Sequence, residues 1–207
     1  PWVSITQTAA ATECSDLGAG YELITNDQWM TIATNIAAQG GNWSNGVVGT
    51  PNAINRGHSD GSVALAASTD NDACFGTTQT CSDVTWHVNR RTHTLSNGEV
   101  IWDMAGNVWN WTSYVISNTS DKPSGGDAWA EFSTVTGTTS MAKTELISNS
   151  WNSSQGMGQF YAGPSGSGGA LHRGGPWNNA TTAGVFTAYL TYDSSNSYEF
   201  IGFRCAK

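Results

Sequence analysis

Three tyrosines in a short polar segment near the carboxyl terminus are the side chains best suited to binding chemistry. Tyr189, Tyr192 and Tyr198 lie within residues 180–200, among Thr, Ser, Asn, Asp and small apolar residues. Tyrosine offers a large amphipathic contact area at low cost in conformational entropy, and small polar residues add adaptable hydrogen bonds. This composition is typical of ligand-binding surfaces, although an ordinary strand–loop–strand segment of a β-rich domain can share it.

The cysteines are the next group with defined chemistry. There are four, Cys14, Cys74, Cys81 and Cys205, and an even number permits three disulfide pairings. The composition is that of a secreted protein, which favours disulfides over four unpaired buried thiols. A zinc site is disfavoured, because the spacing of Cys74 and Cys81 does not suit one and His87 and His93 lack the usual partners.

Charge and composition exclude several classes of protein. The 207 residues carry a net charge of −8 and only eight Lys and Arg, which argues against nucleic-acid binding. No run of about eighteen apolar residues occurs, so we expect no membrane span. Charged residues make up 12% of the chain, a low value that suits a loop-rich extracellular β protein, and ten Trp can supply its core. The first residue is Pro1, which leaves open whether a leader or anchor precedes it.

One helix and one hairpin are expected to position these residues. Thr25 and Gln28 form a capping box, and Gly40 marks the end of a helix over residues 25–38. Its apolar residues recur at helical spacing: Trp29, Ile32, Ala33, Ile36 and Ala37. Residues 92–95 and 99–102 flank Ser-Asn-Gly, which predicts a β-hairpin.

The rest of the chain is rich in turn residues. Residues 41–90 are expected to form irregular loops with short helical turns, residues 117–140 a polar stretch, and residues 165–169 a flexible approach to a final hairpin. Segments 185–186 and 200–205 have the composition of strands. No linker divides the chain, so residues 1–207 are interpreted as a single domain.

Three sequence motifs resemble a known enzyme family. They are Trp102-Asp-Met-Ala-Gly-Asn-Val-Trp-Asn-Trp111, Arg173-Gly-Gly-Pro-Trp177 and Ile201-Gly-Phe-Arg-Cys-Ala206, and Tyr21 to Trp29 adds a fourth similarity. Together they resemble the formylglycine-generating enzymes over residues 14–205. The resemblance implies an α+β, C-type-lectin-like fold, loop-rich with short antiparallel strands and at least one helix packed on a sheet. It also favours a Cys14–Cys205 disulfide joining the two ends of the domain, which leaves Cys74–Cys81 to close a short loop.

A narrower resemblance concerns the segment between the last two motifs. Residues 177–205 are similar to the variable repeats of diversity-generating retroelement target proteins, whose adenine-templated codons are mutated to diversify a ligand site. Asn codons mutated at adenines can give most residues seen here, although not Glu199. The resemblance implies a variable region at about 173–205 with these ligand-binding residues: Trp177, Asn179, Thr182, Ala188, Tyr189, Thr191, Tyr192, Asp193, Tyr198, Glu199 and Phe200.

This resemblance implies a binding protein on a cell or virion surface, with a protein or other macromolecular ligand. The three tyrosines are the expected anchors, and Thr182, Thr191, Asp193 and Glu199 the surrounding polar contacts. Strand alternation predicts that Tyr189 and Thr191 share an exposed face, in one patch with Tyr192, Tyr198 and Glu199. The expected interior residues are Val185, Phe186, Leu190, Ile201 and Phe203, together with Trp102 and Trp111.

Catalysis is not expected. The related enzymes use a cysteine pair that binds copper, but residues 174–204 contain no Cys. The four histidines, His58, His87, His93 and His172, are scattered singly. The alternatives are an enzyme of this family with a relocated site, a subunit of a surface filament, and a sugar-binding lectin, although the Glu-Pro-Asn and Gln-Pro-Asp triplets of calcium-dependent lectins are absent.

Calcium is the one metal that the resemblance suggests; no cofactor is required. The related enzymes bind Ca²⁺ at the positions of Asp103, Gly106, Val108 and Asn110, but Asn110 stands where the family usually has Glu. The alternative is a metal-free turn with Trp109 and Trp111 in the core. A second acidic loop, Asp60 with Asp70 and Asp72, is more typical of solvated turns.

Overall fold

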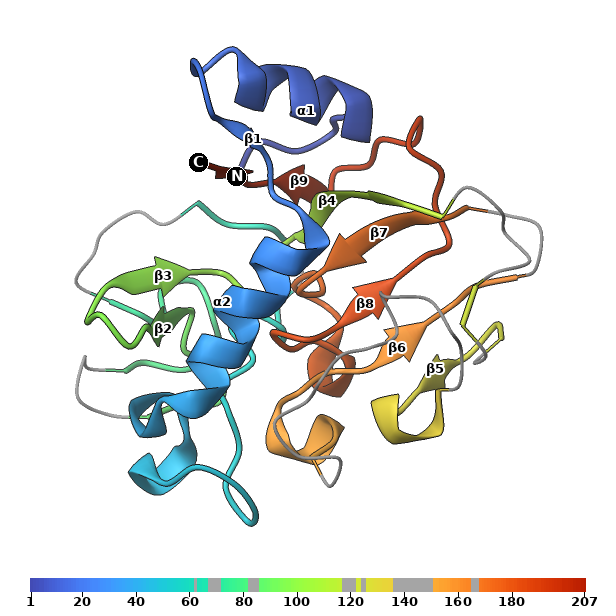
Figure 1. Ribbon diagram of the computed structural model, residues 1–207. Helices are drawn as coiled ribbons and strands as arrows, with labels where there is room; N and C mark the ends of the chain where they lie inside the picture. The colour runs from blue at the N-terminus through green and yellow to red at the C-terminus, as the bar shows by residue number, and fades with distance from the viewer. Residues whose placement is uncertain are drawn as a thin grey trace.

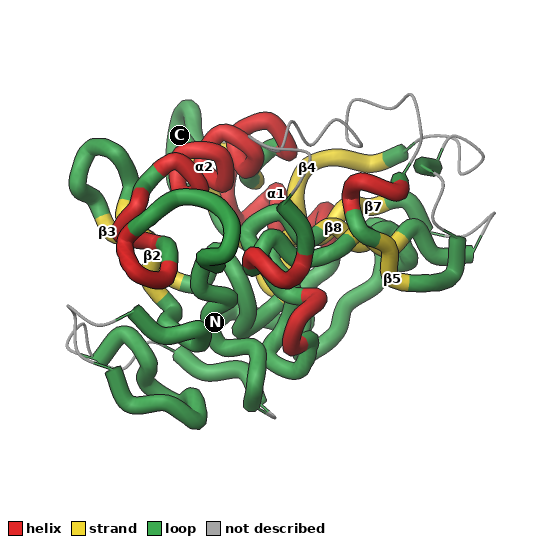
Figure 2. Tube along the Cα trace, turned by 90° about the horizontal axis from the view of Figure 1, so that it is seen from below, coloured by secondary structure: helices red, strands yellow, loops and turns green. Residues whose placement is uncertain are grey.

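Two helices and several short strands are connected by long loops in the computed structural model (Figure 1). The structure describes residues 1–61, 63–66, 72–81, 86–116, 122–123, 126–135, 151–164 and 168–207. Loops and turns make up most of the trace in Figure 2. The expected α+β class is confirmed. None of the helices in the described residues has the length and apolar character needed to cross a membrane.

The main sheet has six short strands in the order β5-β6-β8-β7-β4-β9. They are β4 (Trp109–Val115), β5 (Trp129–Ala130), β6 (Phe160–Tyr161), β7 (Ala170–Arg173), β8 (Ala188–Tyr189) and β9 (Ile201–Phe203). Most pairs are antiparallel as expected, but β6–β8 and β4–β9 are parallel. The two strands of each parallel pair are not consecutive in the chain: β7 comes between β6 and β8, and β5 to β8 come between β4 and β9. Local sequence patterns do not reveal such pairings.

The expected helix is α2 (Asn26–Ala38), and it begins at the capping box. Thr25 Oγ1 accepts a hydrogen bond from Gln28 N (3.1 Å), and Gln28 Oε1 accepts one from Thr25 N (2.8 Å). Trp29, Ala33, Ile36 and Ala37 are fully buried, and Ile32 packs against them. Trp29 Nε1 donates to Val185 O (2.8 Å), so the helix is fixed to the carboxyl-terminal segment.

A second helix, α1 (Gln7–Ser15), is not predicted by the sequence. Its residues are mostly Ala, Thr and Gln, so no broad apolar stripe marks it. Only Gln7, Ala10 and Cys14 are buried. Gln7 Nε2 donates to Thr112 O on β4 (2.6 Å), which ties the helix to the main sheet, and the Cys14–Cys205 disulfide ties it to the carboxyl-terminal residues.

The two ends of the chain meet beside α1 (Figure 1). Strand β1 (Glu22–Leu23) pairs with β10 (Cys205–Ala206), and Cys14 is bonded to Cys205. Ser4 N donates to Tyr198 O (3.0 Å), so the first residues also contact the carboxyl-terminal segment. The expected closure of the domain ends by this disulfide is confirmed.

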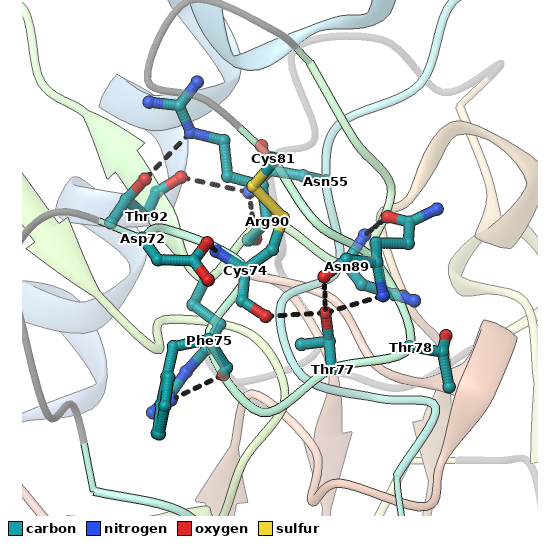
Figure 3. Close-up of a disulfide and its surroundings, with 12 residues drawn as sticks. Asn55, Asp72, Cys74, Phe75, Thr77, Thr78, Cys81, Asn89, Arg90 and Thr92 are labelled. Atoms are coloured by element: carbon teal, nitrogen blue, oxygen red, sulfur yellow. Dashed lines mark hydrogen bonds between the residues drawn. A yellow bond between two sulfur atoms is a disulfide. The ribbon is translucent and has the colours of Figure 1, made fainter.

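The Cys74–Cys81 disulfide is also confirmed and closes a short loop (Figure 3). Asn55 Nδ2 donates to Arg90 O (2.7 Å), and Arg90 Nε donates to Thr92 Oγ1 (2.9 Å). Thr92 begins the expected hairpin of β2 (Thr92–Thr94) and β3 (Val100–Trp102). Gly98 in its turn has φ +85°, a conformation that favours glycine.

The described loops contain five short 3₁₀ turns, including the helical turns expected after α2. They are η1 (Gly40–Asn42), η2 (Ser44–Gly46), η4 (Phe132–Thr134), η5 (Ser153–Gln155) and η6 (Ala180–Thr182).

The tryptophans of the 102–111 motif differ in burial. Trp111 is fully buried, and its Nε1 donates to Ile5 O (2.9 Å), as expected for a core residue. The same expectation for Trp102 is wrong: it is half-buried, and the Arg91 guanidinium lies over its ring at 5.6 Å from the centroid. A cation over the indole face stabilises Trp102 without full burial.

Candidate ligand-binding surface

Two arginines fix the ends of the segment 173–205. Arg173 is fully buried, and it donates to Asn26 Oδ1 (Nη2, 2.7 Å) and Phe186 O (Nη1, 2.8 Å). Burial lowers its pKa to about 9. Arg204 Nη2 donates to the carbonyls of Trp102 and Asp103, each at 2.6 Å. The segment is therefore attached at both ends to residues far away in sequence.

The turn after Arg173 depends on glycine. Gly175 has φ +84°, and a Cβ there would lie 2.9 Å from Ala183 Cβ. Trp177 follows, with its backbone N donating to Asn107 O (3.0 Å). The turn thus brings residues 176–179 back against the rest of the protein.

Most of the expected interior residues of the segment are confirmed. Val185, Phe186, Leu190 and Ile201 are fully buried. Phe203 is only half-buried, because its ring packs edge-on against Trp2 (centroids 5.6 Å apart), which is 58% exposed. The interior prediction is therefore wrong for Phe203.

Tyr189 lies at the centre of a cluster of aromatic rings. It ends β8, which pairs with β6 so that Tyr189 is opposite Tyr161, with ring centroids 5.0 Å apart. Its ring centroid is also 5.1 Å from that of Trp109, 5.9 Å from that of Trp129 and 5.3 Å from that of Tyr192. Strands β6, β8 and β7 lie side by side in Figure 1, and their pairing creates this cluster.

The cluster continues along the segment. Tyr192 packs against Tyr198 (4.8 Å), Tyr198 stacks on Phe200 (5.1 Å, planes 3° apart), and Trp177 meets Phe200 edge-on (6.4 Å). Tyr198 is 39% exposed, and Tyr189, Tyr192 and Phe200 are half-buried. The three expected anchor tyrosines therefore form one continuous, partly exposed series.

These rings line a depression of about 310 Å³, which we name the aromatic pocket. Its lining residues are Trp109, Trp129, Tyr161, Pro176, Asn178, Asn179, Tyr189, Tyr192 and Phe200. Aromatic walls with a few placed polar groups are typical of ligand sites.

Some of the expected ligand-binding residues line the aromatic pocket or pack against its lining, others lie outside it, and one is inaccessible. Asn179, Tyr189, Tyr192 and Phe200 line the aromatic pocket, and Trp177 and Tyr198 pack against Phe200. Asp193 and Glu199 are exposed but do not line it, and Thr182 Oγ1 donates to Asn179 O (2.8 Å). Ala188 is 1% exposed, so its side chain has no access to a ligand in this conformation.

The expected alternation of faces ends with the strand. Strand β8 stops at Tyr189, and Tyr192 rather than Thr191 joins Tyr189. Thr191 Oγ1 is buried without a hydrogen-bond partner in the described structure, and a Cβ on Gly163 would lie 2.5 Å from it. Thr191 therefore packs against a neighbouring loop instead of facing the pocket.

Several pocket residues lie outside the segment from which the site was expected. Trp109 is buried (4% exposed), as expected for a core residue, and also lines the pocket, while Trp129 and Tyr161 come from β5 and β6. Trp129 follows Gly126 and Asp127 in the polar stretch. A large aromatic residue in such polar surroundings is the sequence signal that could have indicated Trp129 as a site residue. Asn178, beside Trp177 in the motif, also lines the pocket.

A neutral histidine packs against several of the pocket's rings, and an acid lies at the pocket's rim. His172 packs under Trp111 (centroids 3.8 Å apart) and near Tyr189, and burial lowers its pKa to about 3. The Tyr161 hydroxyl donates to the exposed carboxylate of Asp127, which raises the pKa of Tyr161 to about 12. Burial, with the neighbouring tyrosines, also raises the pKa of Tyr192. The two phenols are thus uncharged at neutral pH.

Asn179 presents an unused hydrogen-bond donor. Its Nδ2 is buried and has no hydrogen-bond partner among the described residues. A buried donor without a partner costs free energy, so this amide is a weakly satisfied group beside the pocket.

The residues of the expected calcium site do not fit a metal ion. The Asp103 carboxylate accepts hydrogen bonds from Arg91 Nε (2.8 Å) and Nη2 (2.7 Å), and also from Asn107 Nδ2 (3.0 Å). Val108 O accepts a hydrogen bond from Asn110 Nδ2 (3.0 Å), and so Asn110 turns its donor inward. The cation that faces Asp103 is therefore a guanidinium.

The other acidic loop also caps turns. Asp60 Oδ2 accepts from Thr78 N (3.0 Å), and Asp72 Oδ1 accepts from Cys74 N (2.9 Å). Asp70 lies outside the described residues. All four cysteines are in disulfides, and within the described ranges no three His, Cys, Asp or Glu residues gather as a metal site.

Comparisons with known proteins give similarities to solved structures alone. No protein-family model matches the chain, and no curated protein matches it. The Major Tropism Determinant U1 variant is 14% identical, with a TM-score of 0.47 over 97% of this chain and 36% of that protein. The I1 variant is 16% identical, with a TM-score of 0.47 over 98% of this chain and 37% of that protein. The chain thus spans little more than a third of the length of these solved structures.

Proposed function

We propose that the chain is a non-catalytic ligand-binding protein, receptor-like or adhesin-like, acting at a cell or virion surface. Its segment 173–205, with the aromatic pocket, forms the binding surface for a protein or other macromolecular partner. The observation that carries this proposal is the convergence of Tyr189, Tyr192 and Phe200 with Trp109, Trp129 and Tyr161 in one pocket. Partly exposed aromatic residues in a concave site are the usual energetic centre of an interface.

The attachment of the segment supports a diversified surface. Buried Arg173 and half-buried Arg204 hold its ends, and buried Val185, Phe186 and Leu190 hold its middle. The exposed and half-buried residues between them can therefore change without removing the contacts that hold the segment. Surface substitutions of this kind usually alter stability by less than about 0.5 kcal/mol each.

Two matched display libraries test the binding surface. One varies Tyr189, Tyr192, Asp193, Tyr198 and Glu199; the other varies Val47, Val48 and Val100, which are exposed elsewhere. Both are displayed on yeast and selected against the same panel of unrelated proteins, and folded display is followed with a conformation-sensitive antibody. We expect specific binders from the first library only. Equal enrichment from both, or loss of folded display in the first, would contradict the proposal.

The coding DNA tests the diversification itself. A near-copy of the region encoding residues 173–205, differing mainly at adenines and lying beside a reverse-transcriptase gene, is expected. Flanking DNA that lacks both features would contradict diversification, and the proposed binding site would then have a constant sequence.

A further inference from the structure

We propose that the aromatic pocket binds a basic side chain, Arg or Lys, carried by a protein partner. The inference rests on the proposed function and specifies the chemistry of the partner at the same site. Three features of the pocket carry it: its ring faces, its charge and its unpaired amide donor.

The rings offer electron-rich faces to a cation. Trp129 and Tyr161 meet edge-on (62°, centroids 5.2 Å apart), and Trp129, Tyr161 and Tyr189 are half-buried, so part of each ring is accessible at the pocket. The Tyr161 and Tyr192 phenols are neutral, and a neutral ring face attracts ammonium and guanidinium groups. Trp is the most favourable ring for this contact.

The charges around the pocket favour a cation over an anion. No Lys or Arg is among the described residues that line it, and the Asp127 carboxylate stands at its rim, where it accepts from the Tyr161 hydroxyl. Asp193 and Glu199 are exposed beside Tyr192 and Tyr198 in sequence. Lys122 interacts with Asp193, but its Nζ donates to Ala162 O (2.9 Å). With a net charge of −8 for the chain, the field around the site attracts basic partners.

The unpaired donor favours a peptide over a free cation. Asn179 Nδ2 is buried and unpaired in this conformation, and a turn of this half-buried side chain toward the pocket would let it donate to a main-chain carbonyl next to the basic side chain. A sugar hydroxyl can accept from Asn179 and donate to Asp127, but a neutral sugar gains nothing from the net charge of −8. The pocket chemistry therefore fits a basic peptide segment best.

The experiment titrates the protein with small probes and follows the Trp indole N–H signals by NMR. The probes are acetyl-Gly-Arg-Gly-amide, the same peptide with citrulline in place of Arg, and maltotriose. Citrulline keeps the shape of Arg but lacks its charge. The variants are Trp129→Leu and Asp127→Asn in the pocket, with Trp2→Leu as the control for an exposed Trp outside it. The backbone spectrum of each variant reports folding.

We expect the Arg peptide to bind about tenfold more tightly than the citrulline peptide. Trp129→Leu and Asp127→Asn should remove most of this difference, whereas Trp2→Leu should leave it unchanged. Equal binding of the two peptides, or no shift with the Arg peptide, overturns the inference. Binding of maltotriose in place of the peptides overturns it too, and indicates a glycan site. Failure of the display libraries, in contrast, would refute the proposed function itself.

Discussion

Tyr161 and Tyr189 lie opposite each other on the parallel strands β6 and β8, with their rings 5.0 Å apart and 21° from parallel. One belongs to the segment interpreted as variable, and the other does not. The binding surface is therefore shared: changing Tyr189 reshapes the pocket, while Trp109, Trp129 and Tyr161 still provide aromatic walls. In the diversified site that we propose, these three rings would contribute to the binding of every ligand.

Stability measurements should distinguish core residues from residues of the proposed binding surface. Trp111→Ala is expected to lower the free energy of unfolding by about 3–5 kcal/mol, because it leaves a cavity and an unpaired Ile5 carbonyl. Tyr198→Ala should cost less than about 1 kcal/mol, because Tyr198 is 39% exposed. Urea denaturation measures both. Similar losses would place Tyr198 in the core.

The two disulfides should contribute unequally. Cys14–Cys205 spans 191 residues and Cys74–Cys81 spans 7, so loop-closure entropy predicts about 5 and about 2.5 kcal/mol of stabilisation, as upper values. Paired Cys→Ser variants and thermal denaturation measure the difference. Non-reducing peptide mapping should recover both links, and a Cys74–Cys205 peptide would refute this pairing.

Calcium should have no effect on stability, because Arg91 already pairs with Asp103. The melting temperature is expected to be the same in Ca²⁺ and in EDTA. Asp103→Asn should destabilise the protein by about 3–5 kcal/mol, because the fully buried Arg91 loses its carboxylate. Asp127→Asn, an exposed carboxylate, is the matched control. A rise of several degrees in Ca²⁺ would show that the ion displaces Arg91.

The free energy of unfolding should fall as the pH drops below about 6.5. Burial lowers the pKa of His172 to about 3 and that of His93 to about 4, from 6.5 in the unfolded chain. Between these values the unfolded chain binds protons that the folded chain does not, so each His reduces stability by about 1.4 kcal/mol per pH unit. His172→Phe should lower this slope between pH 6.5 and 5 by up to about 1.4 kcal/mol per pH unit, which corresponds to one proton. The contribution of His93 should remain. An unaltered slope would show that His172 does not remain neutral.

The sequence by itself determined the features that depend on local chemistry. The capping box of Thr25 and Gln28 and the Ser-Asn-Gly turn fix a helix and a hairpin through contacts a few residues apart. The anchor tyrosines were also identified from composition, because residues suited to contact surfaces stand out in a polar segment.

Only the tertiary structure decided which residues share the pocket. Trp129 and Tyr161 reach Tyr189 through the β5–β6–β8 pairing, and Thr191 does not line the pocket because β8 ends at Tyr189. The pairing of distant strands sets these contacts, and a sequence pattern carries little information about which strands lie side by side.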